Sequence, residues 1–439
     1  MKSNDDWKRS PLAVHGGPPI REIPLPLESP GIHYFDEDEF AYVKRVINAR
    51  SPFRFYGPQV QHMCDDLEQA FCEQYGVKYA LGVSSGTEAI YISLGALGVG
   101  PGDEVLIPGY LWTSCISGIV RLGAVPRLVD IDNTFTMSPV DFERKIGPHS
   151  KVVILVHMSG APGNVQEIVD IASSHSLKVL EDCAQCNGAT FRGKPVGTFG
   201  DLGMFSFQIN KSITAGEGGM IICNDEHLFR RCFGIHDLGY ARDNRGTLMD
   251  TSCEEKYHMW GCGARMSEMT GALALAQFNK LDIINEAMRS SKWKIRAELE
   301  NLSGLSFRRI LDPDGDTGAF LIIIFESHEI CEKFSEALVV EGVRGEGYGK
   351  PYIPMKDWGL HWYFNNKSLV HRRSLHESGW PWTLPQNSFA EKYQYDRGSL
   401  LVCDDFEKRA ALLKVPSSLT REDIEDIVKA FQKVAYHLL

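Results

Sequence analysis

One lysine is the residue of this 439-residue chain best suited to covalent chemistry. Lys211 lies in the segment 210–219, NKSITAGEGG, which follows a short alternating apolar run. Glycines let a backbone approach a ligand closely, and a lysine beside them at a strand end can act as a Schiff-base nucleophile. Upstream, the segment 178–185, KVLEDCAQ, predicts a short buried strand that ends in the carboxylate of Asp182. The nucleophile Lys211 and the carboxylate of Asp182 are therefore interpreted together.

A lysine that forms an imine and an aspartate that pairs with a pyridinium nitrogen are the protein groups that pyridoxal phosphate (PLP) most requires. Lys211 and Asp182 therefore indicate a PLP enzyme. A lysine shielded from water near a cationic ring has a lowered pKa, as a base at this position requires. The structural alternatives are a solvated loop lysine at Lys211 and a helix N-cap at Asp182.

Composition excludes several classes of protein. Hydrophobic residues make up 43% of the chain and charged residues 23%, which suits a fold of two or three lobes. The net charge of -11 argues against a nucleic-acid partner or an anionic membrane surface. No apolar run approaches the roughly 20 residues of a membrane helix, and the polar start lacks the apolar centre of a signal peptide. We therefore expect a soluble, cytoplasmic protein.

The cysteines and histidines do not suggest a metal site. The 11 cysteines are scattered and odd in number, which is typical of free thiols in a reducing compartment. Cys183 and Cys186 form a C-x-x-C that could be a redox pair or half a zinc site, but no second pair has zinc-ligand spacing. No two of the 14 histidines have H-x-x-x-H spacing. We interpret both cysteines as small packing residues and expect no metal.

From residue 34 to about 270 the pattern predicts a large α/β domain. A helix over 36–49 and another ending near Tyr75 come first. Short apolar runs then alternate with helical patterns, which predicts a mostly parallel sheet covered on both faces. The expected strands are 79–83, 104–107, 126–129, 152–157, 177–181, 203–207 and 219–223, and the expected helices lie near 87–97, 113–122, 139–146, 164–175 and 226–232.

The two ends of the chain have a different character. Residues 1–33 are rich in Pro and Gly, and we expect them to lie extended on the surface or to reach a partner subunit. Residues 271–439 predict a smaller C-terminal α/β domain, with a long helical region over 269–300, a strand over 320–325 and a helix over 420–437. Within it, 345–405 is an irregular insertion, and loops of that length are usually functional.

Four separate motifs carry a family resemblance. SSGTEA at 84–89, GVGPGDEV at 98–105, EDCAQ at 181–185 and the Lys211 segment occur in order along the chain. The sequence resembles the DegT/DnrJ/EryC1/StrS sugar aminotransferases, which belong to the fold type I (aspartate aminotransferase-like) PLP enzymes. The resemblance covers nearly the whole chain. It implies a homodimer with active sites shared between the subunits.

The resemblance also implies roles for single residues. Gly86 and Thr87 stand where a strand gives way to a helix, so their N–H groups could hold the cofactor phosphate at the positive helix end. Ser206 is implied as a hydroxyl partner of the same phosphate. The structural alternatives are an ordinary strand–helix turn with a serine N-cap, and a strand serine that faces solvent.

Around the cofactor ring, the resemblance implies a stacked aromatic side chain at Trp112 and a contact of Gln185 with the phenolic oxygen. A core tryptophan is the structural alternative for Trp112. Asp182 would keep the pyridine nitrogen protonated, which makes the ring an electron sink. Lys211 would bind the cofactor and then move a proton between Cα of the amino donor and C4′ of the cofactor.

One position departs from the family. Many relatives carry G-x-N-x-R-M, whose asparagine reaches the cofactor phosphate of the partner subunit. Here the segment 261–266 reads GCGARM, with Gly263 at the asparagine position. That side-chain contact cannot be carried over, so a backbone N–H or another residue must replace it. For Arg265 we expect a structural role.

The acceptor is expected to contact three regions: 54–56, 236–260 and the insertion. Aromatic and cationic side chains gather in the insertion, which suits an anionic, hydroxylated substrate, although they could also simply pack the loop. They are Tyr348, Lys350, His361, Trp362, Tyr363, Asn366, Lys367, His371, Arg372 and Arg373. Relatives aminate nucleotide-linked keto-sugars, cyclitol ketones or a free acidic sugar aldehyde. The cations favour the last kind, such as an 8-oxo derivative of 3-deoxy-manno-octulosonate destined for lipopolysaccharide.

Three function classes remain to be compared. The first is an aminotransferase that takes the amino group of glutamate or glutamine. The second is the dehydratase branch of the family, which replaces the lysine by histidine, so Lys211 speaks against it. The third is a non-catalytic regulator with a PLP-like fold, for which the sequence shows no DNA-binding domain or basic patch.

Overall fold

The computed structural model describes residues 6–240, 242, 257–346, 349–375 and 377–439. Its larger domain is built on a seven-stranded sheet in the order β1-β9-β8-β5-β4-β2-β3. The strands are β1 (Tyr79–Val83), β2 (Glu104–Pro108), β3 (Val125–Val129), β4 (Ser150–Val156), β5 (Lys178–Asp182), β8 (Leu202–Ser206) and β9 (Gly219–Cys223). Each of the seven predicted strands is present within two residues of its expected bounds.

The pairing is parallel from β3 to β8, whereas β9 runs antiparallel to both β8 and β1. Parallel strands that are buried on both faces form continuous apolar runs, and β2 and β4 follow that rule. Successive residues of β4 enter opposite cores, with Ile154 on one side of the sheet and Leu155 on the other. The carboxyl ends of β4, β5 and β8 consequently meet at one edge of the sheet.

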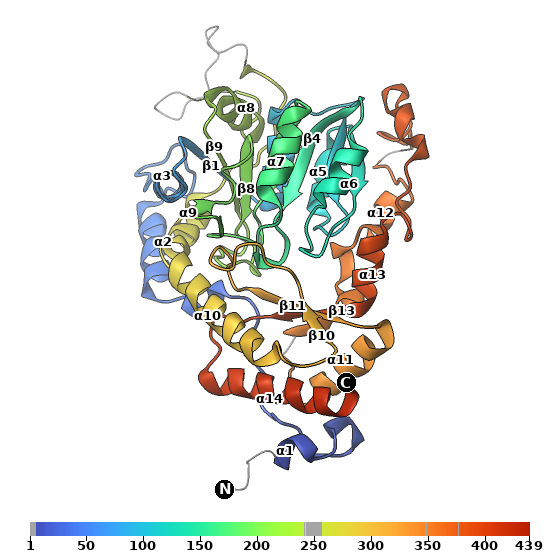
Figure 1. Ribbon diagram of the computed structural model, residues 1–439. Coiled ribbons are helices and arrows are strands. Elements are labelled where there is room, and N and C mark those ends of the chain that lie inside the picture. The colour runs from blue at the N-terminus through green and yellow to red at the C-terminus, as the bar shows by residue number, and fades with distance from the viewer. Residues whose placement is uncertain (1–5, 241, 243–256, 347–348, 376) are drawn as a thin grey trace.

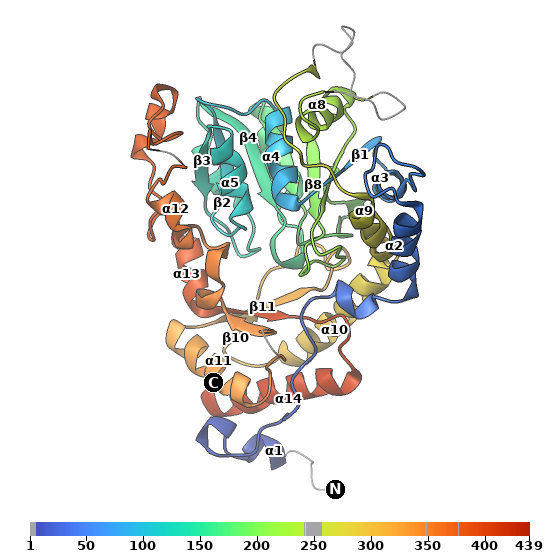
Figure 2. The same cartoon turned by 180° about the vertical axis from the view of Figure 1, so that it is seen from behind.

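Helices cover both faces, as the alternating pattern predicts. α6 (Pro139–Lys145) and α7 (Val165–Ser174) lie on the face seen in Figure 1. α4 (Gly86–Ala96) and α5 (Ser114–Arg121) lie on the face seen in Figure 2, with α8 (Glu226–His236) beside them. α2 (Glu37–Ala49) and α3 (Met63–Tyr75) pack against α9 (Glu268–Phe278) at the β1 side. A capping box of Asp36 and Glu39 begins α2.

The smaller domain has a four-stranded antiparallel sheet in the order β10-β11-β13-β12. The strands are β10 (Leu305–Phe307), β11 (Phe320–Phe325), β12 (Tyr352–Pro354) and β13 (Ala410–Lys414), packed with α10 (Leu281–Leu299), α11 (His328–Val340) and α14 (Arg421–Leu438). The single helical region expected over 269–300 is divided into α9 and α10. Between them, the Lys280 ammonium binds the carboxylates of Asp36 and Glu39.

The N-terminal segment is anchored on the smaller domain rather than lying free on the surface. It begins with α1 (Asp6–Arg9), and Leu12 and Leu25 enter the core of that domain. The buried carboxylate of Glu341 accepts hydrogen bonds from the N–H groups of Ala13 and Ile20. The segment then crosses to the larger domain. Figure 2 shows this part of the chain in blue between the two domains.

The described part of the insertion lies along the β3 side of the larger domain and includes α12 (Lys367–Val370) and α13 (Leu401–Arg409) (Figure 2). Trp362 and Tyr363 are fully buried, and the Trp362 ring stacks on Tyr110 at 4.6 Å. The packing alternative is therefore correct for these two residues. No helix in the described part of the chain is both long and apolar enough to cross a membrane.

Candidate active site

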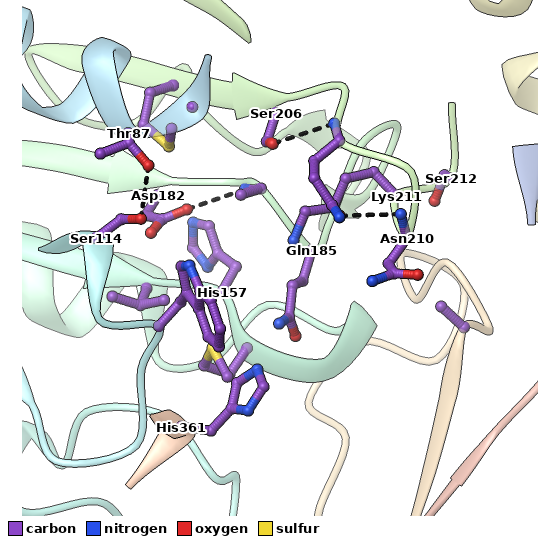
Figure 3. A pocket seen from close by; sticks show the side chains of 18 of the residues that line it. Thr87, Ser114, His157, Asp182, Gln185, Ser206, Asn210, Lys211, Ser212 and His361 are labelled. Atoms are coloured by element: carbon purple, nitrogen blue, oxygen red, sulfur yellow. Dashed lines mark hydrogen bonds between the residues drawn. The ribbon is translucent and has the colours of Figure 1, made fainter. Parts of the chain in front are cut away.

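A cavity of about 480 Å³ opens where the carboxyl ends of the strands meet the amino end of α4 (Figure 3). Such an edge of an α/β sheet is the usual place for a ligand. All seven site residues expected from the sequence line this one cavity. They are Gly86, Thr87, Trp112, Asp182, Gln185, Ser206 and Lys211.

Asp182 is the last residue of β5, and its side chain is buried. Its Oδ1 accepts the N–H of Ala184 at 3.0 Å, and the thiol of Cys115 donates to its Oδ2 at 3.2 Å. Burial and the Asp182 charge raise the pKa of Cys115 well above its ordinary value, so the thiol keeps its proton and remains a donor. Among the described residues the Asp182 carboxylate has these two partners, and such a buried carboxylate favours a cationic N–H group beside it, which a pyridinium nitrogen would supply.

Lys211 lies in the loop after β8, where its N–H bonds the carbonyl of Gln208 at 2.9 Å. Burial lowers the pKa of the Lys211 ammonium, and the negative charge of Asp182 partly opposes that shift. The direction agrees with the expectation for a nucleophilic base. A lowered pKa increases the fraction of free amine, which is the form that attacks a carbonyl.

The amino end of α4 forms a cradle for an anion. Ser85 caps the helix by accepting the N–H of Glu88 at 3.1 Å, whereas the N–H groups of Gly86 and Thr87 have no partner within the helix. A Cβ at Gly86 would lie 2.8 Å from Cβ of Ser206, so only glycine lets the helix approach β8 this closely. The Thr87 and Ser114 hydroxyls share a hydrogen bond of 2.7 Å beside it. These groups fit the phosphate of PLP.

Gln185 is oriented by its own hydrogen bond. Its Oε1 accepts the N–H of Ser159 at 2.9 Å, which leaves the amide NH₂ to donate into the cavity. The carbonyls of Met158 and Ser159 accept from the buried guanidinium of Arg308, which fixes this turn. A fixed donor at this place suits the phenolic oxygen of the cofactor.

Trp112 stands at the cavity edge with 42% of its surface exposed. Its ring lies 4.8 Å from the ring of His361, a residue of the insertion. A large aromatic side chain so exposed inside a ligand cavity has a free face on which a planar ring can stack. The alternative of a core tryptophan does not describe this position.

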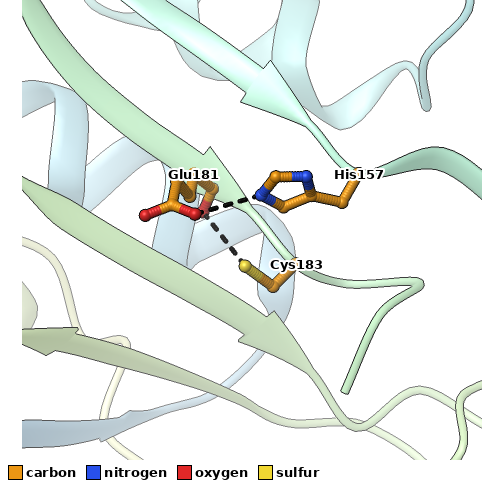
Figure 4. A group of neighbouring side chains, drawn as sticks. All are labelled: His157, Glu181 and Cys183. Atoms are coloured by element: carbon orange, nitrogen blue, oxygen red, sulfur yellow. Dashed lines mark hydrogen bonds and ion pairs between the residues drawn. The ribbon is translucent and has the colours of Figure 1, made fainter. Parts of the chain in front are cut away.

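His157, Glu181 and Cys183 lie together beside the cavity, and all three are residue types that can bind a metal ion (Figure 4). Their hydrogen bonds indicate a structural role instead. The Glu181 carboxylate accepts the N–H groups of Gly197, Phe199 and Gly200, and lies 3.1 Å from Nε2 of His157. Both carboxylate oxygens are thereby occupied, and Cys183 is a buried free thiol like Cys186. The cluster positions β5 and with it Asp182.

The residues expected to select the acceptor are mostly engaged elsewhere. Arg54 is buried and donates to Glu68 and Asp65, and Tyr56 is exposed outside the cavity lining. Arg372 donates to the carbonyls of Ala390, Glu391 and Tyr393, and Lys367 to that of Phe364. Of the ten insertion residues expected at the acceptor, His361 lines the cavity, and Tyr348 lies outside the described residues. In the region 236–260, residues 241 and 243–256 also lie outside the described residues.

Sequence reasoning missed several cavity residues. Ser114 opens a helix without a recognisable motif, and Glu28 and Lys414 come from opposite ends of the chain. At Gly263 a Cβ would meet only Nη2 of Arg265, at 3.6 Å, so the glycine is not required by crowding. Arg265 binds the buried carboxylate of Asp237 at 2.7 Å, which agrees with the expected structural role.

The fold and the site define a PLP-dependent enzyme of fold type I. The family model of the DegT/DnrJ/EryC1/StrS aminotransferases matches residues 33–357, and the chain belongs to this family. It is accordingly an aminotransferase with PLP as its cofactor.

Curated relatives include a putative L-glutamine:3-amino-2,3-dideoxy-scyllo-inosose aminotransferase of Streptoalloteichus tenebrarius, 30% identical over 77% of this chain and 80% of that protein. The GDP-perosamine synthase of Escherichia coli O157:H7 is 40% identical over 49% of this chain and 57% of its own length. Among solved structures, 3-amino-5-hydroxybenzoic acid synthase superposes with a TM-score of 0.74 at 21% identity, covering 94% of this chain and 99% of that one. At that identity the likeness shows the fold alone.

Proposed function

We propose that this aminotransferase moves an amino group from glutamate or glutamine to the carbonyl of a sugar or a cyclitol. The observation that carries the proposal is that Lys211 and Asp182 line one cavity with the amino end of α4. The names of the relatives support the acceptor class, because they include a GDP-perosamine synthase and a putative aminotransferase for an amino-inosose.

When bound, PLP supplies an electron sink for the bond at Cα of the amino donor. The N–H groups of Gly86 and Thr87, with the Ser206 hydroxyl, would hold its phosphate. Asp182 would pair with its protonated ring nitrogen, and the amine of Lys211 would be placed to take a proton from Cα of the amino donor and to return it at C4′.

Nothing in the described cavity favours an acidic acceptor. Two lysines line it, Lys211 and Lys414, against three carboxylates, Glu28, Asp182 and Glu217. The cations of the insertion that led us to expect the 8-oxo-octulosonate and a role in lipopolysaccharide do not line it. We therefore propose a ketone on an uncharged ring, either a cyclitol or the keto-sugar part of a nucleotide-linked sugar whose diphosphate is itself anionic, and keep the octulosonate as the competing acceptor to be tested.

We also propose a cytoplasmic homodimer. An apolar groove on α2 and α9 supports an interface, since Phe40 and Ile47 are exposed there beside Val43 and Leu273. Sedimentation equilibrium of wild type and Phe40→Asp tests it, with a shift toward monomer expected for the variant. A wild-type protein that sediments as a monomer would exclude the dimer.

The visible absorbance of the purified holoenzyme tests the reaction. Glutamate or glutamine should remove the band of the bound cofactor, and the correct carbonyl compound should restore it. Lys211→Ala is the control, because it keeps the cavity but lacks the amine. A wild-type band that neither amino donor changes would refute transamination from these donors.

A further inference from the structure

The start of α5 supports three separate features of the cavity. Trp112 offers its ring face, and the Ser114 hydroxyl shares its hydrogen bond with Thr87 beside the anion cradle. Cys115 does not line the cavity and reaches Asp182 from α5. The N–H of Cys115 donates to the carbonyl of Trp112 at 3.1 Å, which closes the turn between these residues. One short stretch of chain thus carries the stacking ring and the side chain that contacts Asp182.

Cys115 is a hydrogen-bond donor rather than a reactive thiol. Its side chain is fully buried, and its Sγ lies 3.2 Å from Oδ2 of Asp182. Burial and the negative charge of Asp182 raise the pKa of the Cys115 thiol well above its ordinary value. The thiol therefore stays protonated at physiological pH. Its proton is directed to the carboxylate, because an ionised carboxylate can only accept.

The Asp182 carboxylate is held on both of its oxygens. Oδ1 accepts the N–H of Ala184 at 3.0 Å, and Oδ2 accepts the Cys115 thiol. The backbone is fixed as well, since the carbonyl of Asp182 accepts the N–H of His157 at 3.0 Å. An ionised carboxylate has about four lone-pair positions. Two positions consequently remain for a cationic N–H group in the cavity.

The Cys115 bond also affects the basicity of Asp182. A proton shared by a carboxylate and a pyridine nitrogen lies on the more basic of the two. A hydrogen bond donated to a carboxylate stabilises its ionised form and makes it less basic. With the thiol bond in place, the shared proton stays on the ring nitrogen, which is the form of the ring that withdraws electrons. Without that bond, Asp182 draws the proton toward itself.

We propose, resting on the proposed function, that Cys115 is a positioning residue whose thiol hydrogen bond keeps the Asp182 carboxylate ionised and oriented toward the ring nitrogen of PLP. It acts through Asp182 and does not line the cavity. The role requires a donor at this position rather than sulfur itself. Serine at position 115 can therefore replace the cysteine, whereas alanine and valine cannot.

The experiment compares how the cofactor-free protein binds PLP and 1-deaza-PLP, in which a C–H group replaces the ring nitrogen. Equilibrium dialysis gives both dissociation constants, and the change of their ratio between variants isolates the contact at the ring nitrogen. Cys115→Ala and Cys115→Val lose the donor and differ in volume, and Cys115→Ser keeps a donor. Asp182→Ala is the positive control. Cys232→Ala is the matched negative control, because Cys232 is also buried in the same core but lies in α8.

Cys115→Ala and Cys115→Val should each reduce the preference for PLP over 1-deaza-PLP about fivefold, the effect of one net hydrogen bond. Cys115→Ser should restore most of the preference, Asp182→Ala should lower it furthest, and Cys232→Ala should match wild type. Circular dichroism of the cofactor-free proteins checks the fold of each variant. If Cys115→Ala does not fold, the comparison of Cys115→Val with Cys115→Ser decides.

Three other outcomes are distinct from this one. If the variants without a donor bind both compounds equally more weakly, or bind both like wild type, Cys115 has no role toward the ring nitrogen and the proposal is wrong. If Asp182→Ala leaves the ratio unchanged, Asp182 does not pair with the ring nitrogen, and the proposal fails with that role. If neither glutamate nor glutamine changes the visible band of the PLP-loaded wild type, the proposed function fails, whatever the binding ratios are.

Discussion

Replacing Glu181 by glutamine should destabilise the protein strongly, although the side chain touches no solvent. The carboxylate is fully buried and accepts two hydrogen bonds on each oxygen, from three backbone N–H groups and His157. Glutamine turns one of these oxygens into an NH₂ group that faces two donors. Each bond to a charged acceptor contributes about 1.5–3 kcal/mol, so losing two predicts a loss of about 3–6 kcal/mol.

Urea unfolding of Glu181→Gln at pH 7, followed by circular dichroism, measures this loss. Asp201→Asn is the matched control, because Asp201 accepts the N–H of Val179 on the same strand but is 24% exposed and pairs with the exposed Lys178. The control should lose about 1 kcal/mol. If Glu181→Gln lost no more than the control, the carboxylate would not be the main support of β5.

Four further predictions follow from the site and the core. Lys211→Ala should abolish turnover while leaving the fold intact by circular dichroism; near-native activity in a coupled assay would remove Lys211 from its role. Asp182→Ala should weaken cofactor binding and slow the glutamate half-reaction at least a hundredfold, which equilibrium dialysis and stopped-flow absorbance measure; wild-type values in both would exclude the pyridinium contact. Because burial lowers the pKa of Lys211 from 10.5, the unfolded chain binds more protons than the folded one between the two pKa values. The unfolding free energy of the cofactor-free wild type, measured relative to that of Lys211→Met, should therefore rise with pH until the pH reaches the pKa of free lysine. If the difference between the two unfolding free energies stayed constant from pH 7 to 10 in urea, this prediction would be wrong. Lys292→Met leaves the buried Asp316 carboxylate unpaired and should cost about 3–5 kcal/mol in urea unfolding, most of which Lys292→Met with Asp316→Asn should recover; a single variant as stable as the double would argue against the pair.

The sequence predicts the larger domain well because its signals are local. Each of the seven strands of the larger sheet is a mostly apolar run bounded by turn residues, and buried parallel strands allow little else. The antiparallel direction of β9 has no such signal, since it depends on a short connection after Lys211 rather than on a crossover helix. The division between α9 and α10 was missed for a similar reason, because Lys280 is bound by carboxylates of α2 far away in the chain.

The candidate site divides in the same way. Asp182 and Lys211 stand in motifs that chemistry alone makes recognisable, and the structure places both in one cavity. The cations of the insertion were expected at the acceptor because of their charge, and Arg54 as part of the region 54–56. Arg54 bonds carboxylates and Arg372 bonds carbonyls instead. Glu28 carries no sequence signal, since only the folded chain brings it beside Lys414. A charged side chain in a loop indicates that an interaction partner exists, but the sequence does not show whether that partner is the substrate or another group of the protein.

The ion pair of Glu28 with Lys414 joins residues 386 positions apart in the chain. During synthesis, a ribosome has assembled the motifs around Asp182 and Lys211 long before it reaches β13, so the nascent larger domain can collapse while one side of its cavity is still missing. Completion of that side must await release of the C-terminal segment from the exit tunnel. Translation order thus keeps a partly made chain from presenting a finished cavity to the metabolites around it.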